Sequence, residues 1–195
     1  MNADFYDHDY YDGDGKSNYE RYTFESSPFA LHADAIVATM AHYGLAGPVL
    51  DIGCAKGYLV YVLRQRGVEA YGIDWSAYAI ASASPDVRPY LQCASAMDLP
   101  FAASQFALAV SFDVLEHLDE PHVRRALVES ARVSRRQLHQ ANTGRLDEWR
   151  FHGDASHCLK YSLREWVEMA AELGLDGTTI CEPDRRLPFL DEVVC

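Results

Sequence analysis

The segment from Pro48 to Val60, PVLDIGCAKGYLV, holds residue types that could bind a ligand through the backbone. An apolar run interrupted by Asp51 leads into a turn with Gly53 and Gly57, and a helical pattern follows. This order predicts a strand, a tight turn and a helix, because glycine lets the backbone turn sharply and approach a ligand closely. The helix start would offer N–H groups and the positive end of a dipole to an anionic or hydrogen-bond-accepting group.

A second candidate ligand-binding residue, Asp74, ends the apolar run from Ala70 to Ile73. It follows Gly53 by 21 positions. This spacing suits a carboxylate at the tip of the second strand of a βαβ unit, where it can accept hydrogen bonds from both hydroxyls of a ribose. The alternative role is an ordinary helix cap, since a helical pattern opens two residues later. The adjacent Trp75 would either lie against an adenine or be partly buried surface.

Two later acids also follow apolar runs. Asp98 lies in a short loop before Leu-Pro-Phe, and Asp113 directly follows the run from Phe106 to Phe112. In an open α/β sheet, ligands bind beyond the carboxyl ends of the strands, where the strand order switches. We therefore expect Asp74, Asp98 and Asp113 to lie along one rim of a sheet.

Together these segments resemble the class I S-adenosylmethionine-dependent methyltransferases of the small-molecule type. DIGCAKG is similar to the family's first motif, usually D/E-x-G-x-G-x-G, with Ala55 in place of the middle glycine. The segment DVLEH, which begins at Asp113, resembles the family's strand-four tip. The dinucleotide fingerprint G-x-G-x-x-G is absent, since positions 55 and 58 are Ala and Tyr. The resemblance covers about residues 28 to 195.

The resemblance implies S-adenosylmethionine as the cofactor and S-adenosylhomocysteine as its product. Gly53 and Gly57 would line the pocket for the methionine part of the cofactor, and Asp51 would orient the turn. Asp98 would accept from the adenine amino group with Met97 against the ring, or else be an exposed loop residue. The expected cofactor-binding residues are Asp51, Gly53, Cys54, Ala55, Gly57, Asp74, Trp75, Met97, Asp98 and Asp113.

Methyl transfer from a sulfonium is an in-line displacement, so the protein must align the nucleophile, exclude water and, for an alcohol, help remove a proton. The candidate bases are His117, after the fourth strand, and the pair Asp154 and His157 in the long polar segment 142–160. His139, on the predicted fifth strand, is a further candidate. Each has a structural alternative, since His117 can tie down a neighbouring loop and the pair can serve loop packing.

Four residues near the second candidate base are of types that bind zinc or iron: His152, Asp154, His157 and Cys158. Their positions do not repeat the ligand spacing of a known metal site, so no metal is expected.

A Rossmann-like α/β fold would position all of these residues. We predict a seven-stranded, mostly parallel sheet with helices on both faces and an antiparallel last strand. The expected strands are Val49–Ile52, Ala70–Ile73, Pro89–Cys93, Phe106–Phe112, Gln137–Ala141, Thr178–Cys181 and Phe189–Cys195. Helices are expected from a Ser27 cap to Tyr43, from Gly57 to Arg66, from Ser76, from Pro121 to Val133, and from a capping box at Ser162.

Residues 1–27 are predicted to be a separate arm, and residues 28–195 a single cofactor-binding domain. The first 16 residues show no strand or helix period, which indicates a flexible segment, yet the arm is rich in tyrosine. Aromatic side chains in a polar segment need a surface to rest on. The arm would therefore either pack on the domain edge or form a lid over the active site.

Composition limits the partners and the compartment. The net charge of −12 argues against nucleic acid, and no apolar run approaches the roughly 20 residues that span a bilayer. The N-terminus lacks the pattern of a signal peptide, and the five cysteines include no C-x-x-C. We therefore expect a cytoplasmic protein with reduced thiols and a small-molecule methyl acceptor. The outer strand and the arm could mediate a homodimer.

The expected activity is O-methylation of a hydroxyl or carboxyl group of a sugar or secondary metabolite in a biosynthetic reaction. Methyltransferases of base amines or amides often carry Asn/Asp-Pro-Pro-Tyr after strand four, and this chain has no Pro-Pro. One alternative is a protein of the same fold that uses the cofactor for other chemistry or for regulation. A nucleotide-dependent oxidoreductase is the third possibility, and a binding screen with nicotinamide cofactors would distinguish it from the other two.

Overall fold

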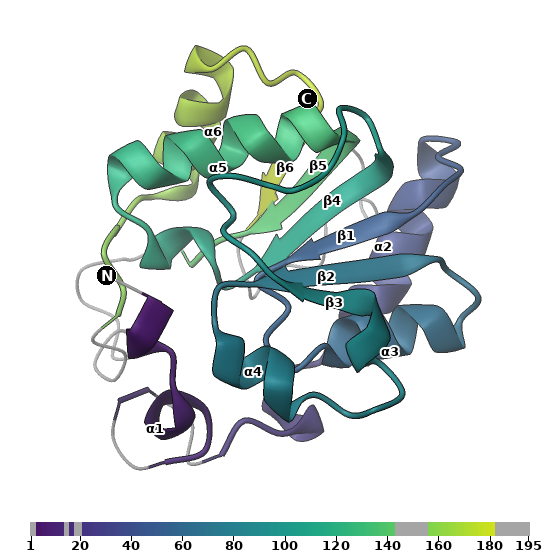
Figure 1. Cartoon of the computed structure of the whole chain (residues 1–195). Coiled ribbons are helices and arrows are strands. Elements are labelled where there is room, and N and C mark those ends of the chain that lie inside the picture. The colour runs from purple at the N-terminus through teal and green to yellow at the C-terminus, as the bar shows by residue number, and fades with distance from the viewer. Residues whose placement is uncertain (1–2, 14–15, 18–20, 143–155, 182–195) are drawn as a thin grey trace.

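The computed structural model describes residues 3–13, 16–17, 21–142 and 156–181, which are organised around a six-stranded sheet (Figure 1). The strand order is β3-β2-β1-β4-β5-β6, and all neighbouring pairs are parallel. The order reverses between β1 and β4, which is where ligands bind in sheets of this kind. The strands are β1 Val49–Ile52, β2 Ala70–Asp74, β3 Leu91–Cys93, β4 Phe106–Phe112, β5 Ser134–Gln140 and β6 Thr178–Cys181.

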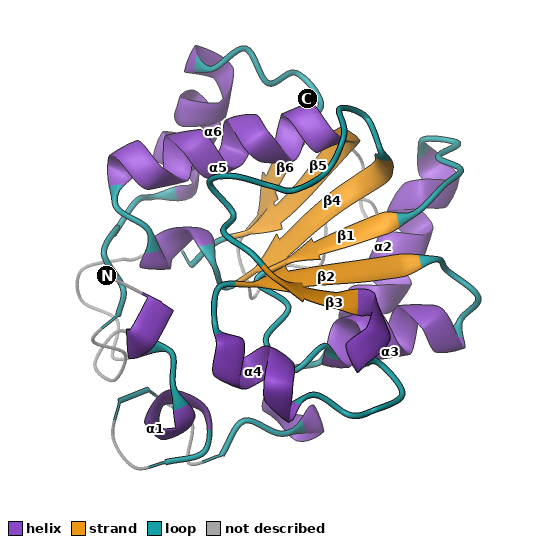
Figure 2. Ribbon diagram, viewed as in Figure 1, coloured by secondary structure: helices purple, strands orange, loops and turns teal. Residues whose placement is uncertain are grey.

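Helices cover both faces of this sheet, as Figure 2 shows. Alternate residues of β1 serve the two faces: Val49 packs in the core cluster of α2 and α3, while Leu50 packs in the cluster of α5. Burial on both faces explains why the central strands read as nearly continuous apolar runs. The helices are α1 His8–Tyr11, α2 Phe29–His42, α3 Tyr58–Gln65, α4 Ala77–Ser82, α5 Glu120–Val133 and α6 Leu163–Glu172.

The predicted parallel α/β sheet is confirmed for six strands, with small differences in their bounds. β3 is shorter than expected because residues 88–90, which include Pro89, form a 3₁₀ turn. β5 begins three residues early because α5 runs directly into it. The predicted seventh, antiparallel strand, Phe189–Cys195, lies outside the described residues and stays a prediction.

The helix starts were predicted with mixed success. The capping box at Ser162 is confirmed, since its side chain and that of Glu165 each bond the other's backbone N–H. The Ser27 cap is wrong, because Pro28 occupies the N-cap of α2 and no side-chain cap is formed there. On α2, His32 and Ala33 face inward and are buried, whereas Leu31 is 67% exposed.

The predicted flexibility of residues 1–16 is wrong for the part of the arm that the structure describes. Tyr10 and Tyr11 in α1 are buried, and they cluster with Ala55 and Ala79 of the domain. The Asp12 carboxylate accepts two hydrogen bonds of 2.7 Å from the Lys56 ammonium group. Packing on the domain is therefore what this structure shows, and closure of the arm as a lid stays a prediction.

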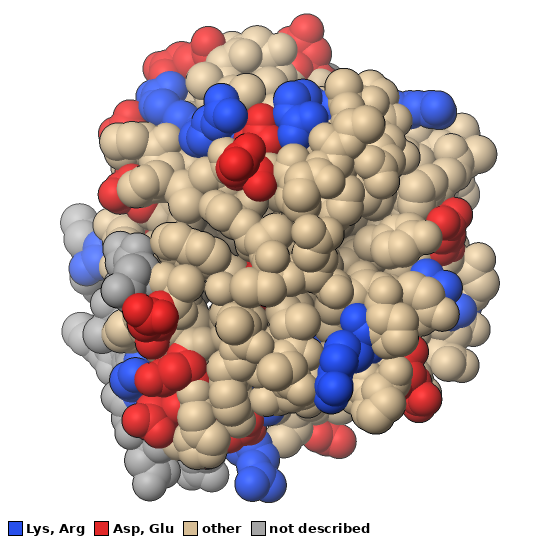
Figure 3. Space-filling view, in the orientation of Figure 1, with Lys and Arg blue, Asp and Glu red and all other residues tan. Residues whose placement is uncertain are grey.

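Positive and negative side chains are mixed on the face that carries α5 (Figure 3). Arg124 lies within 3.0 Å of Glu120 and 2.9 Å of Glu172, and Arg132 lies 2.7 Å from Glu129. The arginines of α5 are thus paired and form no basic patch of the kind that binds nucleic acid. Within the described parts of the chain, no helix has the length and apolarity that a bilayer crossing requires.

Glu129 of α5 fixes the loop that follows β3. Its side chain is 4% exposed, accepts a 3.0 Å hydrogen bond from the Leu99 N–H and bonds Arg132, which in turn donates to the carbonyls of Leu99 and Phe101. Glu129, together with Arg132, therefore anchors the loop that contains Met97 and Asp98 to α5.

We expect Glu129→Ala to lower the free energy of unfolding by about 2 kcal/mol, because the buried Leu99 N–H loses its acceptor. Urea denaturation measures the change. Glu168→Ala is the matched control, since Glu168 pairs with Arg164 on the exposed surface and should change stability by less than about 0.5 kcal/mol. Equal effects of the two substitutions would contradict the anchoring role.

Candidate functional site

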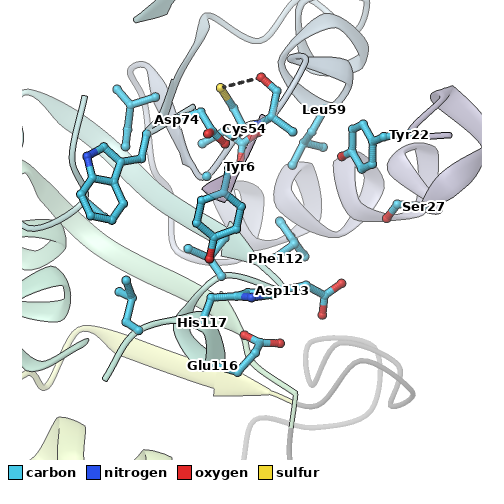
Figure 4. Close-up of a pocket in the computed structure, with 18 of the residues that line it drawn as sticks. Tyr6, Tyr22, Ser27, Cys54, Leu59, Asp74, Phe112, Asp113, Glu116 and His117 are labelled. Carbon is cyan, nitrogen blue, oxygen red and sulfur yellow. Dashed lines mark hydrogen bonds between the residues drawn. The ribbon is translucent and has the colours of Figure 1, made fainter. Parts of the chain in front are cut away.

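A cavity of about 360 Å³ opens at the carboxyl ends of β1, β2 and β4 (Figure 4). Its walls come from the arm, the first turn of α2, the β1–α3 turn, the end of β2, the tip of β4 and the segment before α6. It therefore lies at the reversal of strand order, as the sequence predicted. The predicted residues that line it are Asp51, Gly53, Cys54, Ala55, Asp74, Trp75, Asp113, His117 and His157.

The turn after β1 has the tight backbone that the sequence predicted. Gly53 has φ 79°, and a Cβ atom there would lie 2.4 Å from Val114, so only glycine fits against the β4 tip. Ala55, which replaces the usual glycine, also adopts a positive φ of 47°. A non-glycine residue in this region is strained, and such strain is typical of ligand-binding turns.

Asp74 holds this turn against the end of β2. One carboxylate oxygen accepts a 2.8 Å hydrogen bond from the Ala55 N–H, and the other accepts a 2.7 Å bond from the Ser76 N–H. Burial raises the pKa of Asp74 to about 6, against these hydrogen bonds, which lower it. The helix-cap alternative for Asp74 is wrong, because the Ser76 hydroxyl caps α4 by accepting from the Ala79 N–H.

A second buried acid, Asp51, lies beside Asp74 in a different charge state. Asp51 is 3% exposed, and burial, with a further contribution from the Asp74 charge, raises its pKa to about 8. At pH 7 the Asp51 carboxyl is therefore mostly protonated while Asp74 is mostly ionised. The pocket thus combines one neutral acid, able to donate a hydrogen bond, with one carboxylate acceptor.

Glu116 organises the tip of β4, a role that the sequence analysis missed. Its side chain is fully buried and accepts a 3.0 Å hydrogen bond from the Asn142 N–H, beyond the end of β5. Its backbone carbonyl accepts from the N–H groups of Cys158 and Leu159. Glu116 therefore joins three wall segments of the cavity, and the sequence signal for it was only its place in DVLEH.

The structure brings His117 and His157 together. Their ring centroids lie 4.6 Å apart with the planes nearly perpendicular, and His117 Nδ1 lies 2.7 Å from the Ser156 hydroxyl. The Tyr6 ring approaches His117 from the arm, with its hydroxyl directed toward that ring (Figure 4). Their third predicted partner, Asp154, lies outside the described residues. The two histidines thus form one contacting pair in the cavity wall.

The hypothesis that His139 is a base is wrong. His139 is 1% exposed and lies in the core, where its two ring nitrogens are 2.8 Å from the Ser111 hydroxyl and 3.3 Å from the Ser130 hydroxyl. Burial lowers its pKa to about 4, so the ring is neutral. It joins β4, β5 and α5 instead of facing the cavity.

Three other predicted cofactor residues, Gly57, Met97 and Asp98, do not line the cavity. Gly57 has φ 77° and packs so closely on Leu91 that a Cβ atom would lie 2.6 Å from its side chain. The Met97 carbonyl accepts from Arg125, and the Asp98 N–H donates to the Ser95 carbonyl. Their neighbour Ala96 does reach the cavity wall.

Aromatic and imidazole groups that the sequence analysis did not single out form much of the wall. The arm supplies Tyr6, Tyr10, Tyr11 and Tyr22, and α2 supplies Phe29 and His32. The only sequence signal for the four arm residues was the tyrosine content of the arm. No signal marked His32, because its place depends on how α2 packs on the sheet.

The described lining is acidic. It includes no Lys or Arg but contains five carboxyl groups, those of Asp51, Asp74, Asp113, Glu116 and Asp119. Such a wall suits cationic or neutral ligand groups. No group of three or more potential ligands is arranged for a metal ion within the described ranges, and the candidates His152 and Asp154 lie outside them.

Comparisons with known proteins agree with this geometry. Residues 50–137 match a family described as "Methyltransferase domain". The O-methyltransferase resE of Aspergillus sclerotiorum is 37% identical over 95 residues, 45% of this chain and 35% of that protein. The ubiquinone biosynthesis O-methyltransferase of Azoarcus sp. (strain BH72) is 38% identical over 88 residues, 41% of this chain and 37% of that protein. The matched segment thus spans little more than a third of either relative.

The fold comparison extends over more of the chain. The YcgJ protein of Bacillus subtilis superimposes with a TM-score of 0.60 at 26% identity, over 73% of this chain and 67% of that one. The matched residues 50–137 carry the β1–α3 turn, Asp74 and the β4 tip that border the cavity. Residues 50–137 therefore match a methyltransferase domain in sequence, and the fold of the described chain agrees with that match.

Proposed function

We propose that this protein transfers the methyl group of S-adenosylmethionine to an oxygen atom of a small molecule. The acceptor would be a hydroxyl or carboxyl group of a sugar or secondary metabolite. The observation that carries this proposal is that the β1–α3 turn, Asp74 and the His117–His157 pair border one cavity. Cofactor-binding groups and candidate bases thus face the same enclosed space.

The cavity residues fit the chemistry of the cofactor. Each Asp74 oxygen accepts one backbone N–H bond, and a carboxylate oxygen has a second lone pair that can accept a ribose hydroxyl. Trp75 lines the cavity next to Asp74 and can stack on the adenine. Met97 and Asp98 stay candidates for adenine contacts, reached through a shift of their loop.

When bound, the cofactor supplies a methyl group activated by the positive sulfur. The protein then has to orient the acceptor oxygen, remove its proton and exclude water. We assign the proton removal to His117 or His157, with Ser156 fixing the His117 ring and Asp154 as the candidate partner of His157. The arm tyrosines would shield the reaction from water.

The acceptor class rests on two further observations. Both curated relatives are named O-methyltransferases, which favours an oxygen acceptor. The acidic described lining favours a neutral hydroxyl over a carboxylate, because like charges repel in a partly desolvated cavity. A cofactor-binding protein with non-methylating chemistry or a regulatory role is the alternative, since the same fold can host either.

We also propose a domain organisation, a cellular location and an oligomeric state, which the comparisons do not test. Residues 1–27 would be an arm on a single domain of residues 28–195, completed by an antiparallel seventh strand. A cytoplasmic location without nucleic-acid or membrane partners, and a homodimer through the outer strand or the arm, belong to the same proposal.

The activity is tested by incubating the protein with S-adenosylmethionine and a panel of phenols, sugars and hydroxy acids. We expect S-adenosylhomocysteine to accumulate in step with a product heavier by one CH₂ group. Cofactor binding without such a product from any class would favour the non-methylating alternative.

We expect Asp74→Asn to weaken S-adenosylhomocysteine binding at pH 7 by about tenfold or more, because a charged acceptor of the ribose hydroxyls is lost. Isothermal titration calorimetry measures the affinity. Asp51→Asn should weaken S-adenosylhomocysteine binding clearly less at this pH, since burial favours the uncharged form of the Asp51 carboxyl. Wild-type affinity of Asp74→Asn would rule out the ribose role.

We expect His157→Ala to lower kcat by roughly a hundredfold or more, because a positioned base contributes about 10²–10⁴ to the rate. The affinity for S-adenosylhomocysteine should stay within about twofold. His42→Ala, at the far end of α2, is the matched histidine control. Turnover at the wild-type level would show that His157 packs the loop and is not the base.

A further inference from the structure

The described part of the arm crosses the cavity from the end of β2 to the tip of β4. The Tyr6 carbonyl accepts a hydrogen bond from the hydroxyl of Ser76, just beyond β2. The Tyr6 ring lies against the ring of His117 at the β4 tip, with centroids 6.2 Å apart. In the view of Figure 4, the Tyr6 side chain accordingly lies between Asp74 and His117. The arm thus joins the two sides of the cavity across the reversal of strand order.

A second stretch of the arm packs on the β1–α3 turn. Tyr10 and Tyr11 are buried and form one cluster with Ala55 of this turn. Both tyrosines also line the cavity, as Tyr6 and Tyr22 do. A ligand that binds against the turn is therefore in contact with the arm as well, and the arm covers it on that side.

An ion pair ties the arm to the turn. The Lys56 ammonium group donates two 2.7 Å hydrogen bonds to the Asp12 carboxylate and one of 3.1 Å to the Tyr22 carbonyl. The Tyr78 hydroxyl of α4 donates a further bond of 2.8 Å to Asp12. The side chains of Lys56 and Asp12 are only 9% and 13% exposed. Because a charge buried to this extent is costly without its partner, the pair resists movement of the arm away from the turn.

We propose that the Asp12–Lys56 pair is a latch that holds the arm across the cavity, so that S-adenosylmethionine and S-adenosylhomocysteine enter and leave only when it opens. The proposal rests on the cofactor binding proposed above and adds the control of cofactor exchange. Lys56 directly follows Ala55, whose N–H group bonds Asp74. The latch is thus anchored in the turn that borders the cavity. A ligand that binds the closed form therefore also stabilises the closed arm.

The exchange rates of S-adenosylhomocysteine test the latch without an acceptor. Surface plasmon resonance on the immobilised protein gives the association and dissociation rate constants. We expect Asp12→Asn and Lys56→Met each to raise the dissociation rate about tenfold or more, because each removes one charge of the pair. The association rate should rise as well, since entry and exit use the same opening. The Kd therefore changes much less than the dissociation rate.

Lys16→Met is the matched control. Lys16 also pairs with an aspartate, Asp7, at 2.6 Å, but both residues belong to the arm and are partly exposed. The same substitution there removes an ion pair without touching the link to the turn, so both rates should stay within about twofold of the wild type. The double variant Asp12→Asn/Lys56→Met should exchange no faster than the faster single variant, because each substitution alone already breaks the pair.

Hydrogen exchange measured by mass spectrometry follows the arm directly. The Tyr22 N–H donates to the Tyr11 carbonyl within the docked arm, so this amide reports opening. We expect S-adenosylhomocysteine to slow exchange in the arm of the wild type and of Lys16→Met, and much less in that of Lys56→Met. Circular dichroism confirms that the variants are folded. Asp12→Asn leaves the sequence of the turn intact and tests the latch even if Lys56→Met does not fold.

Two outcomes would overturn the latch. One is a dissociation rate within about twofold of the wild type in both Asp12→Asn and Lys56→Met. The other is faster dissociation with an unchanged association rate, which would make the arm a contact of the bound ligand and not a gate. Neither result bears on methyl transfer, which the acceptor panel tests separately. Failure of the wild-type protein to bind S-adenosylhomocysteine would instead overturn the proposed function together with the latch.

Discussion

The hydrogen bond from the Ala55 N–H to the Asp74 carboxylate is the interaction on which the cavity depends. It joins the turn after β1 to the end of β2, and the N–H groups of Gly53 and Cys54 reinforce the link by donating to the Ile73 carbonyl. Because Ala55 is held at a positive φ, the turn needs such bonds to keep its shape. The close contact of Gly53 with Val114 then fixes the β4 tip against the same turn. The two halves of the cavity are thus built on one short segment.

The same arrangement explains why two neighbouring acids have different charges. Asp51 and Asp74 are both buried, but Asp74 accepts backbone hydrogen bonds from Ser76, Ala55 and Trp75 that favour its charged form. The main influences on Asp51 are burial and the charge of Asp74, both of which favour its neutral form. The charged form is therefore favoured at the β2 side of the cavity, and the neutral form at the end of β1.

The sequence predicted the parts of the fold whose physical cause is local or topological. β1, β4 and β6 were predicted with the observed bounds, and the cause is clearest for β4, since a strand buried on both faces reads as a nearly continuous apolar run. The bounds of β5 were predicted less well, because the strand contains buried polar residues. Gln137 bonds Ser134, and His139 bonds Ser111 and Ser130, and the sequence does not reveal these partners. Asp74 and Asp113 reached the rim as expected, because topology alone brings strand ends together.

What the sequence did not predict depends on contacts between distant segments. Glu116, His32 and Tyr6 enter the wall because β4, α2 and the arm pack around one space, and no local pattern encodes that packing. The arm shows the cause most clearly. Lys56 lies within the β1–α3 turn, and its ammonium group bonds Asp12 and the Tyr22 carbonyl across 44 and 34 positions of sequence. Both charged side chains of the pair are largely buried, so either one alone would be costly to bury. The arm and the turn therefore support each other, and a segment whose sequence indicates a flexible tail forms part of the cavity wall.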